Sequence, residues 1–107
     1  METRKAFDYE IKFHDLIRNE FLSISTENSV YLLEVLAEND FIVRGGWFDK
    51  HGLSPCRVGI EGTTWGVGDV FTDIAAAAGM RIKFKNGIIT SPIKSVERLI
   101  SLAWHQL

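Results

Sequence analysis

The chain has 107 residues, of which 46% are hydrophobic and 24% are charged, and its formal net charge is −2 at pH 7. This length and composition predict a single globular domain, residues 1–107, with a buried core. The nearly balanced charge argues against a dedicated duplex-DNA binder, which would be strongly basic. No apolar run approaches the roughly 18 residues of a membrane-spanning helix.

Cysteine usage and the first residues bear on the cellular compartment. Cys56 is the single cysteine, so the chain forms no internal disulfide, which favours a reducing environment. The first residues, METRKAFDYEIKFHD, are charged throughout and lack the apolar centre of a signal peptide. We therefore expect a cytoplasmic protein that does not associate with membranes.

The first forty residues are predicted to form two helices. Between residues 7 and 24, apolar side chains recur at steps of three and four, which is the spacing of one face of an amphipathic helix. Residues 25–28, STEN, suit a cap or a turn. Residues 29–40 show the helical spacing again, although 29–37 is also compatible with a buried strand.

Two strands and a buried helix are predicted for the middle of the chain. Residues 41–44 and 56–60 alternate apolar and polar side chains, as strands do, and residues 49–55 are predicted to be a loop. Residues 69–78 are apolar on nearly every side, which indicates a buried helix. Gly79 is placed to end that helix in a left-handed conformation.

The last part of the chain predicts a hairpin followed by a helix. Residues 81–90 read as two strands joined by Asn86-Gly87, a pair that favours a two-residue type I′ turn. Residues 92–107 begin with a proline that follows a serine N-cap, and they carry a continuous apolar stripe at helical spacing. The predicted order is α-α-β-β-α-β-β-α, an α+β domain with a four-stranded antiparallel or mixed sheet and helices packed on one face.

A glycine-rich turn lies between the strand and the helix predicted within residues 58–79, an arrangement that binds phosphate in many proteins. Phe71 stands where a dinucleotide-binding fingerprint requires a small residue, and no Lys-Ser/Thr pair follows the turn as in a P-loop. Asp69 falls in the first turn of the predicted helix, where its charge would repel a phosphate. We therefore predict a helix cap here, and no cofactor.

No residue pattern specifies a catalytic or metal site. His14 falls in an apolar stripe, His51 lies on a polar loop that offers no nucleophile, and Cys56 alternates with residues expected in the core. Asp69 and Asp73 lie one predicted helical turn apart, close enough to share a cation, but solvated carboxylates commonly have this spacing. We assign no catalytic residues and no metal ligands. Whether the chain is an enzyme stays open, with a non-enzymatic role favoured.

Charge is distributed unevenly along the sequence. Residues 1–40 contain four Lys/Arg and nine Asp/Glu, a balance of −5, whereas residues 41–107 contain eight and five, a balance of +3. Such asymmetry indicates attraction between the two halves of the chain or toward a partner. If the predicted strands share one sheet, their alternation directs five cations to one side of it. These are Arg44, Arg57, Arg81, Lys83 and Lys85.

The predicted cationic face has three interpretations. It is a solvated face that discourages aggregation, a docking site for an acidic protein surface, or a platform for single-stranded nucleic acid with Trp47 or Trp65 stacking on bases. The acidic surface includes the acidic first half of a second copy in a homodimer. The face itself carries no aromatic residues, which argues against nucleic acid.

The favoured function is a small non-enzymatic interaction domain that acts through this basic face, as a homo-oligomer or as an accessory partner protein. The alternative is a small-molecule-binding or hydrolytic domain with a site at the 47–51 and 61–69 loops. That site would gather Asp49, His51, Trp65 and Asp69.

Overall fold

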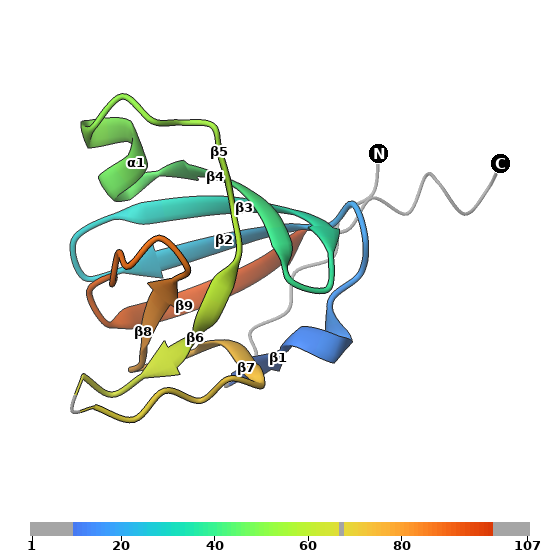
Figure 1. The fold of residues 1–107 in the computed structure, drawn as a ribbon, viewed down its shortest axis with the longest axis vertical. Coiled ribbons are helices and arrows are strands. Elements are labelled where there is room, and N and C mark those ends of the chain that lie inside the picture. The colour runs from blue at the N-terminus through green and yellow to red at the C-terminus, as the bar shows by residue number, and fades with distance from the viewer. Residues whose placement is uncertain (1–9, 67, 100–107) are drawn as a thin grey trace, which may run out of the picture.

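The computed structural model describes residues 10–66 and 68–99, which are mostly β-strand (Figure 1). The strands are β1 (Glu10–Lys12), β2 (Phe21–Thr26), β3 (Val30–Ala37), β4 (Asp40–Gly45), β5 (Cys56–Val58), β6 (Ile60–Thr64), β7 (Ile74–Ala77), β8 (Arg81–Phe84) and β9 (Ile93–Leu99). The helical elements of the described residues are one short helix, α1 (Gly46–Lys50), and a 3-10 turn at Phe13–Asp15. The predicted α+β fold with several helices is therefore wrong.

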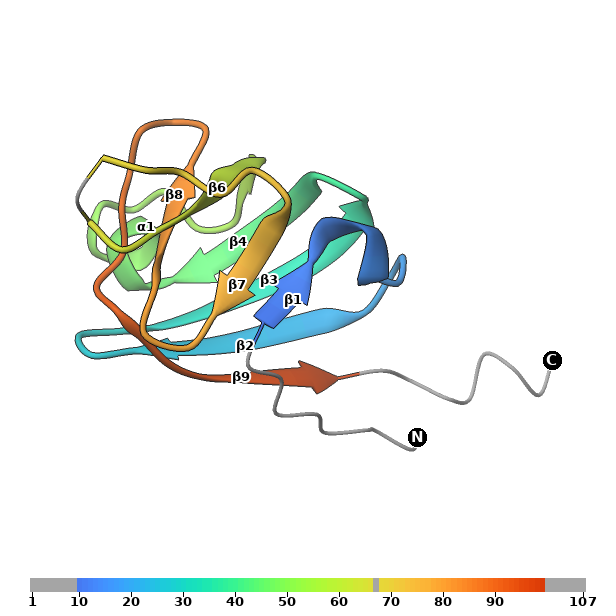
Figure 2. The ribbon, with the colours of Figure 1, turned by 90° about the horizontal axis from the view of Figure 1, so that it is seen from below.

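The strands form three antiparallel sheets. The large sheet has five strands in the order β5-β4-β3-β2-β9, and two small sheets pair β1 with β7 and β6 with β8. Strands β1, β6, β7 and β8 lie on one side of the large sheet (Figure 2). In Figure 1 the chain from β5 into β6 runs across the strands of the large sheet. The core therefore lies between the large sheet and the two small ones.

The core follows the alternation of side chains along each strand. The large sheet contributes Leu22, Ile24, Tyr31, Leu33, Val35, Phe41, Val43 and Val96, all buried. The opposite layer contributes Ile11, Ile60, Ala75, Ala76, Ile82 and Phe84, and α1 adds Phe48. The ring of Phe48 packs edge-on against Phe84, with centroids 5.2 Å apart, and so joins the helix to the small β6–β8 sheet.

The predicted helix at residues 7–24 is replaced by β1, the 3-10 turn, a loop and β2. Asn19 has a φ of +73°, a left-handed conformation that a right-handed helix does not contain. Residues 7–9 of that prediction lie outside the described residues. Residues 30–37 form β3, so for this segment the strand alternative is confirmed and the helix is wrong.

The predicted helix at residues 69–78 is also wrong, because the run of alanines forms β7. Alanine has the highest intrinsic helix propensity, but Ala75, Ala76 and Ala77 are all buried. Ala76 pairs with Ile11 of β1. The small side chains suit this strand because it is buried rather than half-exposed, and packing overrides the propensity. Gly79 does adopt a left-handed φ of +83°, but at a turn between two strands.

The predicted helix at residues 92–107 is replaced by β9 over the residues that the structure describes. Ile93 and Val96 both face the core, although they are three positions apart. The pairing of β9 with β2 shifts between Ser25 and Thr26, and this bulge changes the strand period of two into a step of three. The bulge therefore produces a spacing that is typical of a helix. Residues 100–107 of that prediction lie outside the described residues.

Two predicted strands are confirmed with modified bounds. The strand predicted at residues 41–44 is β4, and the one predicted at residues 56–60 divides into β5 and β6 at Gly59. The segment predicted as a loop, 49–55, begins inside α1. The chain therefore turns from the large sheet into the small β6–β8 sheet where a single strand was expected.

Of the two strands predicted at residues 81–90, the first is β8, whereas the second forms only an isolated bridge to it, in a register one residue away from the prediction. Lys83 pairs with Ile89, and the Phe84 N–H donates to the Ile88 carbonyl at 2.8 Å. The loop therefore has three residues, with Gly87 at a φ of +92°, because a type I′ turn would also require a positive φ at Asn86. As a result Ile88 packs against the core, and Ile89 is exposed.

Candidate functional site

The glycine-rich turn leads into a strand and not into a helix, so the predicted helix cap at Asp69 is wrong. The segment folds back on β6 instead: Phe71 and Thr63 exchange two backbone hydrogen bonds of 2.8 and 3.2 Å. A Cβ at Gly62 would lie 2.4 Å from the Phe71 carbonyl oxygen, so glycine is required for this close approach. The turn therefore offers no helix N-terminus to a phosphate.

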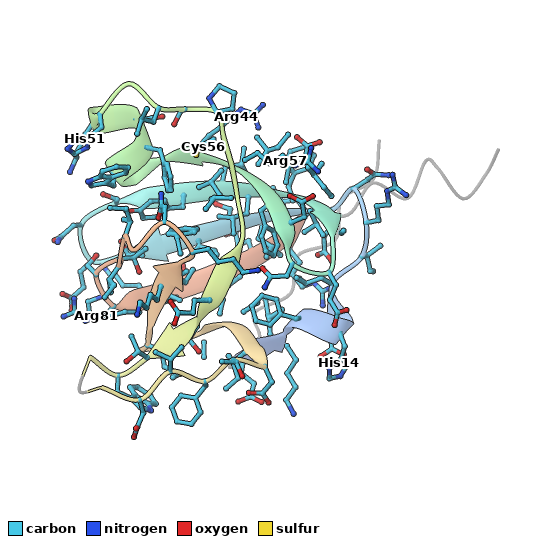
Figure 3. The ribbon with its side chains drawn as sticks, in the orientation of Figure 1. His14, Arg44, His51, Cys56, Arg57 and Arg81 are labelled. Carbon is cyan, nitrogen blue, oxygen red and sulfur yellow. The ribbon has the colours of Figure 1, made fainter. Side chains whose placement is uncertain are left out.

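The five predicted cations lie in different sheets. Arg44 and Arg57 belong to the large sheet, whereas Arg81 and Lys83 belong to β8, which pairs with β6, and Lys85 follows β8 directly. Arg44 and Arg57 lie far from Arg81 (Figure 3). The expectation of one cationic sheet face assumed a single four-stranded sheet, and the division into separate sheets removes that basis.

Three of these cations form ion pairs with carboxylates of neighbouring strands. The pairs are Arg44–Glu34 at 3.7 Å, Arg57–Asp40 and Lys83–Glu61 at 3.3 Å. Arg81 donates a weak hydrogen bond to the Thr90 carbonyl at 3.4 Å, and Lys85 lies over Gly59. The internal pairs neutralise much of the charge that an acidic partner would recognise.

The Arg57–Asp40 pair has the clearest electrostatic signature. Arg57 binds both carboxylate oxygens of Asp40, with its Nε 3.0 Å from Oδ1. This side-chain hydrogen bond is the main cause that lowers the pKa of Asp40 below its ordinary value of 3.8, and the charges of Arg57 and Lys85 add to it. The bidentate geometry fixes Arg57 against its own sheet.

The alternative site at the two loops is not assembled. His51 stacks on Trp47 with ring centroids 4.3 Å apart, and Asp49 accepts a hydrogen bond from the Gly45 N–H at 3.0 Å. Hydrogen bonds from Ser54 and then Gly45 lower the pKa of Asp49. In Figure 1, α1 lies far from the segment that joins β6 to β7. The pairs Asp49/His51 and Trp65/Asp69 therefore belong to separate parts of the surface.

The two candidate tryptophans differ in exposure. Trp47 is partly buried against the core, with its ring 5.4 Å from that of Phe48. Trp65 is exposed, and its ring edge would lie 3.2 Å from a Cβ at Gly79. The two residues sit on different elements and do not form a joint stacking platform.

Within residues 10–66 and 68–99, no three His, Cys, Asp or Glu side chains are grouped so that they could hold a metal ion. None of the helical segments in that part of the chain is long and apolar enough to cross a membrane.

The strongest candidate surface is the side of the large sheet that faces away from the small sheets, which we call the outer face. Four half-buried apolar side chains lie there at outward positions of three adjacent strands: Phe21 on β2, Leu32 and Leu36 on β3, and Ile42 on β4. None of them is among the partly buried residues that pack against the core. We call these four residues the outer patch.

Glu34 lies at the centre of the outer patch. Its direct cross-strand partners are Phe21 on β2 and Ile42 on β4. Leu32 and Leu36 lie two positions away along β3, Leu36 at the bulge where the pairing with β4 shifts. The Glu34 carboxylate is 3.7 Å from the Arg44 guanidinium. The patch thus surrounds one ion pair with four apolar side chains.

The strand alternative for residues 29–37 contains the sequence signal for this patch, which the helix prediction does not. The segment VYLLEVLA, residues 30–37, is apolar on both faces when read with period two, except at Glu34. A strand that is apolar on both sides is typical of a sheet covered on both faces. When these residues are read as a helix, they fall on several sides of it, and the two apolar faces of the strand are not apparent.

The chain matched no protein-family model, no curated protein sequence and no solved structure.

Proposed function

We propose that this chain is a non-catalytic protein-interaction domain that docks through the outer patch. The single observation that supports this function best is the cluster of four apolar side chains pointing away from the core of the large sheet. A contiguous apolar patch on a soluble-domain surface commonly marks an interaction site.

The surroundings of the outer patch support docking of another protein surface. Beyond the patch, the outward positions of β2 carry the small polar residues Ser23 and Ser25, and β5 carries Arg57. The face is built from adjacent strands of one sheet, and such a broad surface suits another protein better than a small molecule. The internal ion pairs also mean that the partner need not be strongly acidic, in contrast to the sequence-based expectation.

Aspartate substitutions on and off the patch test this function. Leu32→Asp places a charge in the patch, whereas Ile89→Asp places one at an exposed apolar position of the hairpin after β8. We expect Leu32→Asp to abolish association of the tagged domain with untagged copies and with proteins of its host cell, while Ile89→Asp leaves association unchanged. Equal association of wild type and both variants, with folding verified by circular dichroism, would refute the function.

A further inference from the structure

We infer that the partner of the outer patch is a second copy of this chain, and that in the dimer each Glu34 pairs with the Arg44 of the other copy. This inference rests on the proposed docking function and names its partner. It begins from the position of β3, the middle strand in the order β5-β4-β3-β2-β9. Two strands flank β3 on each side, so a twofold axis that passes between Glu34 and Arg44 lets one large sheet cover another and places each Glu34 opposite the Arg44 of the other copy.

The charges of the patch are self-complementary. The four apolar side chains enclose the carboxylate of Glu34, whose partner is the adjacent Arg44 guanidinium, and the neighbouring Arg57 is held by Asp40. A twofold-related copy therefore offers a cation to Glu34 and an anion to Arg44. In a twofold-symmetric contact the interchain pair between Glu34 and Arg44 therefore forms twice. A strongly acidic or strongly basic partner would instead place a like charge against one of the two.

Burial favours this pairing in the dimer. Glu34 is already mostly covered, with 28% of its side chain exposed, and a second sheet would remove much of the remaining water. A carboxylate enclosed by apolar side chains is costly unless a cation pairs with it. The intrachain distance of 3.7 Å is longer than a close charge-assisted hydrogen bond, so the guanidinium has room to improve its contact across the interface.

Charge reversal tests the exchange directly. Glu34→Arg gives a patch with two cations, and Arg44→Glu gives one with two anions. We expect wild type to sediment as a reversible dimer, and each single variant to dimerise at least about tenfold more weakly. An equimolar mixture of the two variants is expected to restore the dimer, since both interchain pairs then join opposite charges. The double variant Glu34→Arg/Arg44→Glu is expected to dimerise alone.

A matched control distinguishes charge reversal at the outer patch from charge reversal elsewhere on the surface. Glu61→Arg reverses a carboxylate paired with Lys83 on the β6–β8 sheet, and we expect it to leave the dimer unchanged. Circular dichroism of each variant verifies the fold. A monomeric wild type at every concentration, full dimerisation of the single variants, or a mixture that stays monomeric would each overturn the inference. If wild type is monomeric but Leu32→Asp still loses capture of a different protein, the docking function stands and the second copy is excluded as partner.

Discussion

Glu20 and Arg98 form a two-bond ion pair that joins the loop before β2 to β9. The Arg98 Nε donates to Oε1 of Glu20 at 2.8 Å, and the Arg98 Nη2 donates to Oε2 at 2.7 Å. Glu20 is fully buried, and its carboxylate also accepts the Ile17 backbone N–H. Arg98 donates in addition to the Asp15 carbonyl at 2.8 Å. The pair thus fixes two segments that are distant in sequence against one end of the large sheet.

Removing the charge of Glu20 should strongly destabilise the fold. Glu20→Gln keeps the shape of the side chain but deprives Arg98 of its buried counter-ion, and we expect a loss of about 3 kcal/mol in the free energy of unfolding. Glu61→Gln, which breaks the exposed pair with Lys83, should cost less than about 1 kcal/mol. Urea denaturation of both variants measures the difference, and equal losses would contradict a structural role of the buried pair.

Two glycines with similar φ angles should respond very differently to alanine. Gly45 has a φ of +96° and a ψ of −177°, a region that only glycine occupies readily, and a Cβ there would lie 2.3 Å from the Val30 carbonyl oxygen. Gly87 has a φ of +92° but no atom within 4 Å of an added Cβ. We expect Gly87→Ala to cost about 1–2 kcal/mol and Gly45→Ala clearly more. Thermal denaturation distinguishes them, and a similar loss in both would disprove the close approach.

Alanine substitutions of the adjacent residues Leu32 and Leu33 of β3 should differ in their cost to stability, because the two side chains lie on opposite faces of the sheet. Leu33 is fully buried, so Leu33→Ala should cost about 2–5 kcal/mol. Leu32 points to the outer face, and Leu32→Ala should cost less than about 1.5 kcal/mol in the isolated chain while weakening self-association. Chemical denaturation at low protein concentration measures the first effect without a contribution from the dimer. A larger loss for Leu32 would mean that the inner and outer faces are interchanged.

The Arg57–Asp40 pair should make a pH-dependent contribution to stability. The folded-state pKa of Asp40 lies below its ordinary value of 3.8, so the pair stabilises the fold above that pH, and its contribution is lost as the pH falls through the lowered pKa. Arg57→Gln removes the main cause of the shift and should return the pKa of Asp40 toward its ordinary value. NMR titration of the Asp40 side chain measures this. An unchanged midpoint in Arg57→Gln would rule out the pair as the cause.

Local sequence signals predicted the elements that depend on near neighbours. The alternation at residues 41–44 and the turn residues Asn86-Gly87 gave β4 and the hairpin after β8, although the register of the hairpin depends on where Ile88 packs. The face on which Cys56 lies was also predicted, since it packs against the core. In each case the determining interactions lie within a few residues.

The errors arose where long-range packing decides the structure. The bulge opposite Ser25 and Thr26 gave Ile93 and Val96 a helical spacing, and burial against β1 placed the alanine run in a strand. The predicted cationic face failed because sequence alternation gives the face of each strand but not the sheet to which the strand belongs. For the outer patch, residues 30–37 indicate a strand that is apolar on both faces, but they do not indicate that β2 and β4 pair with it.

Solvent exposure of methyl groups on the outer face, measured by NMR with a soluble paramagnetic agent, tests the docking claim most directly. Leu32 and Ile42 carry methyls on the outer patch, and Leu53 and Ile89 carry exposed methyls elsewhere. As the protein concentration rises, we expect the relaxation enhancement of Leu32 and Ile42 to fall while that of Leu53 and Ile89 stays constant. Enhancements that remain unchanged at all four residues over the full concentration range would contradict self-docking through this sheet face.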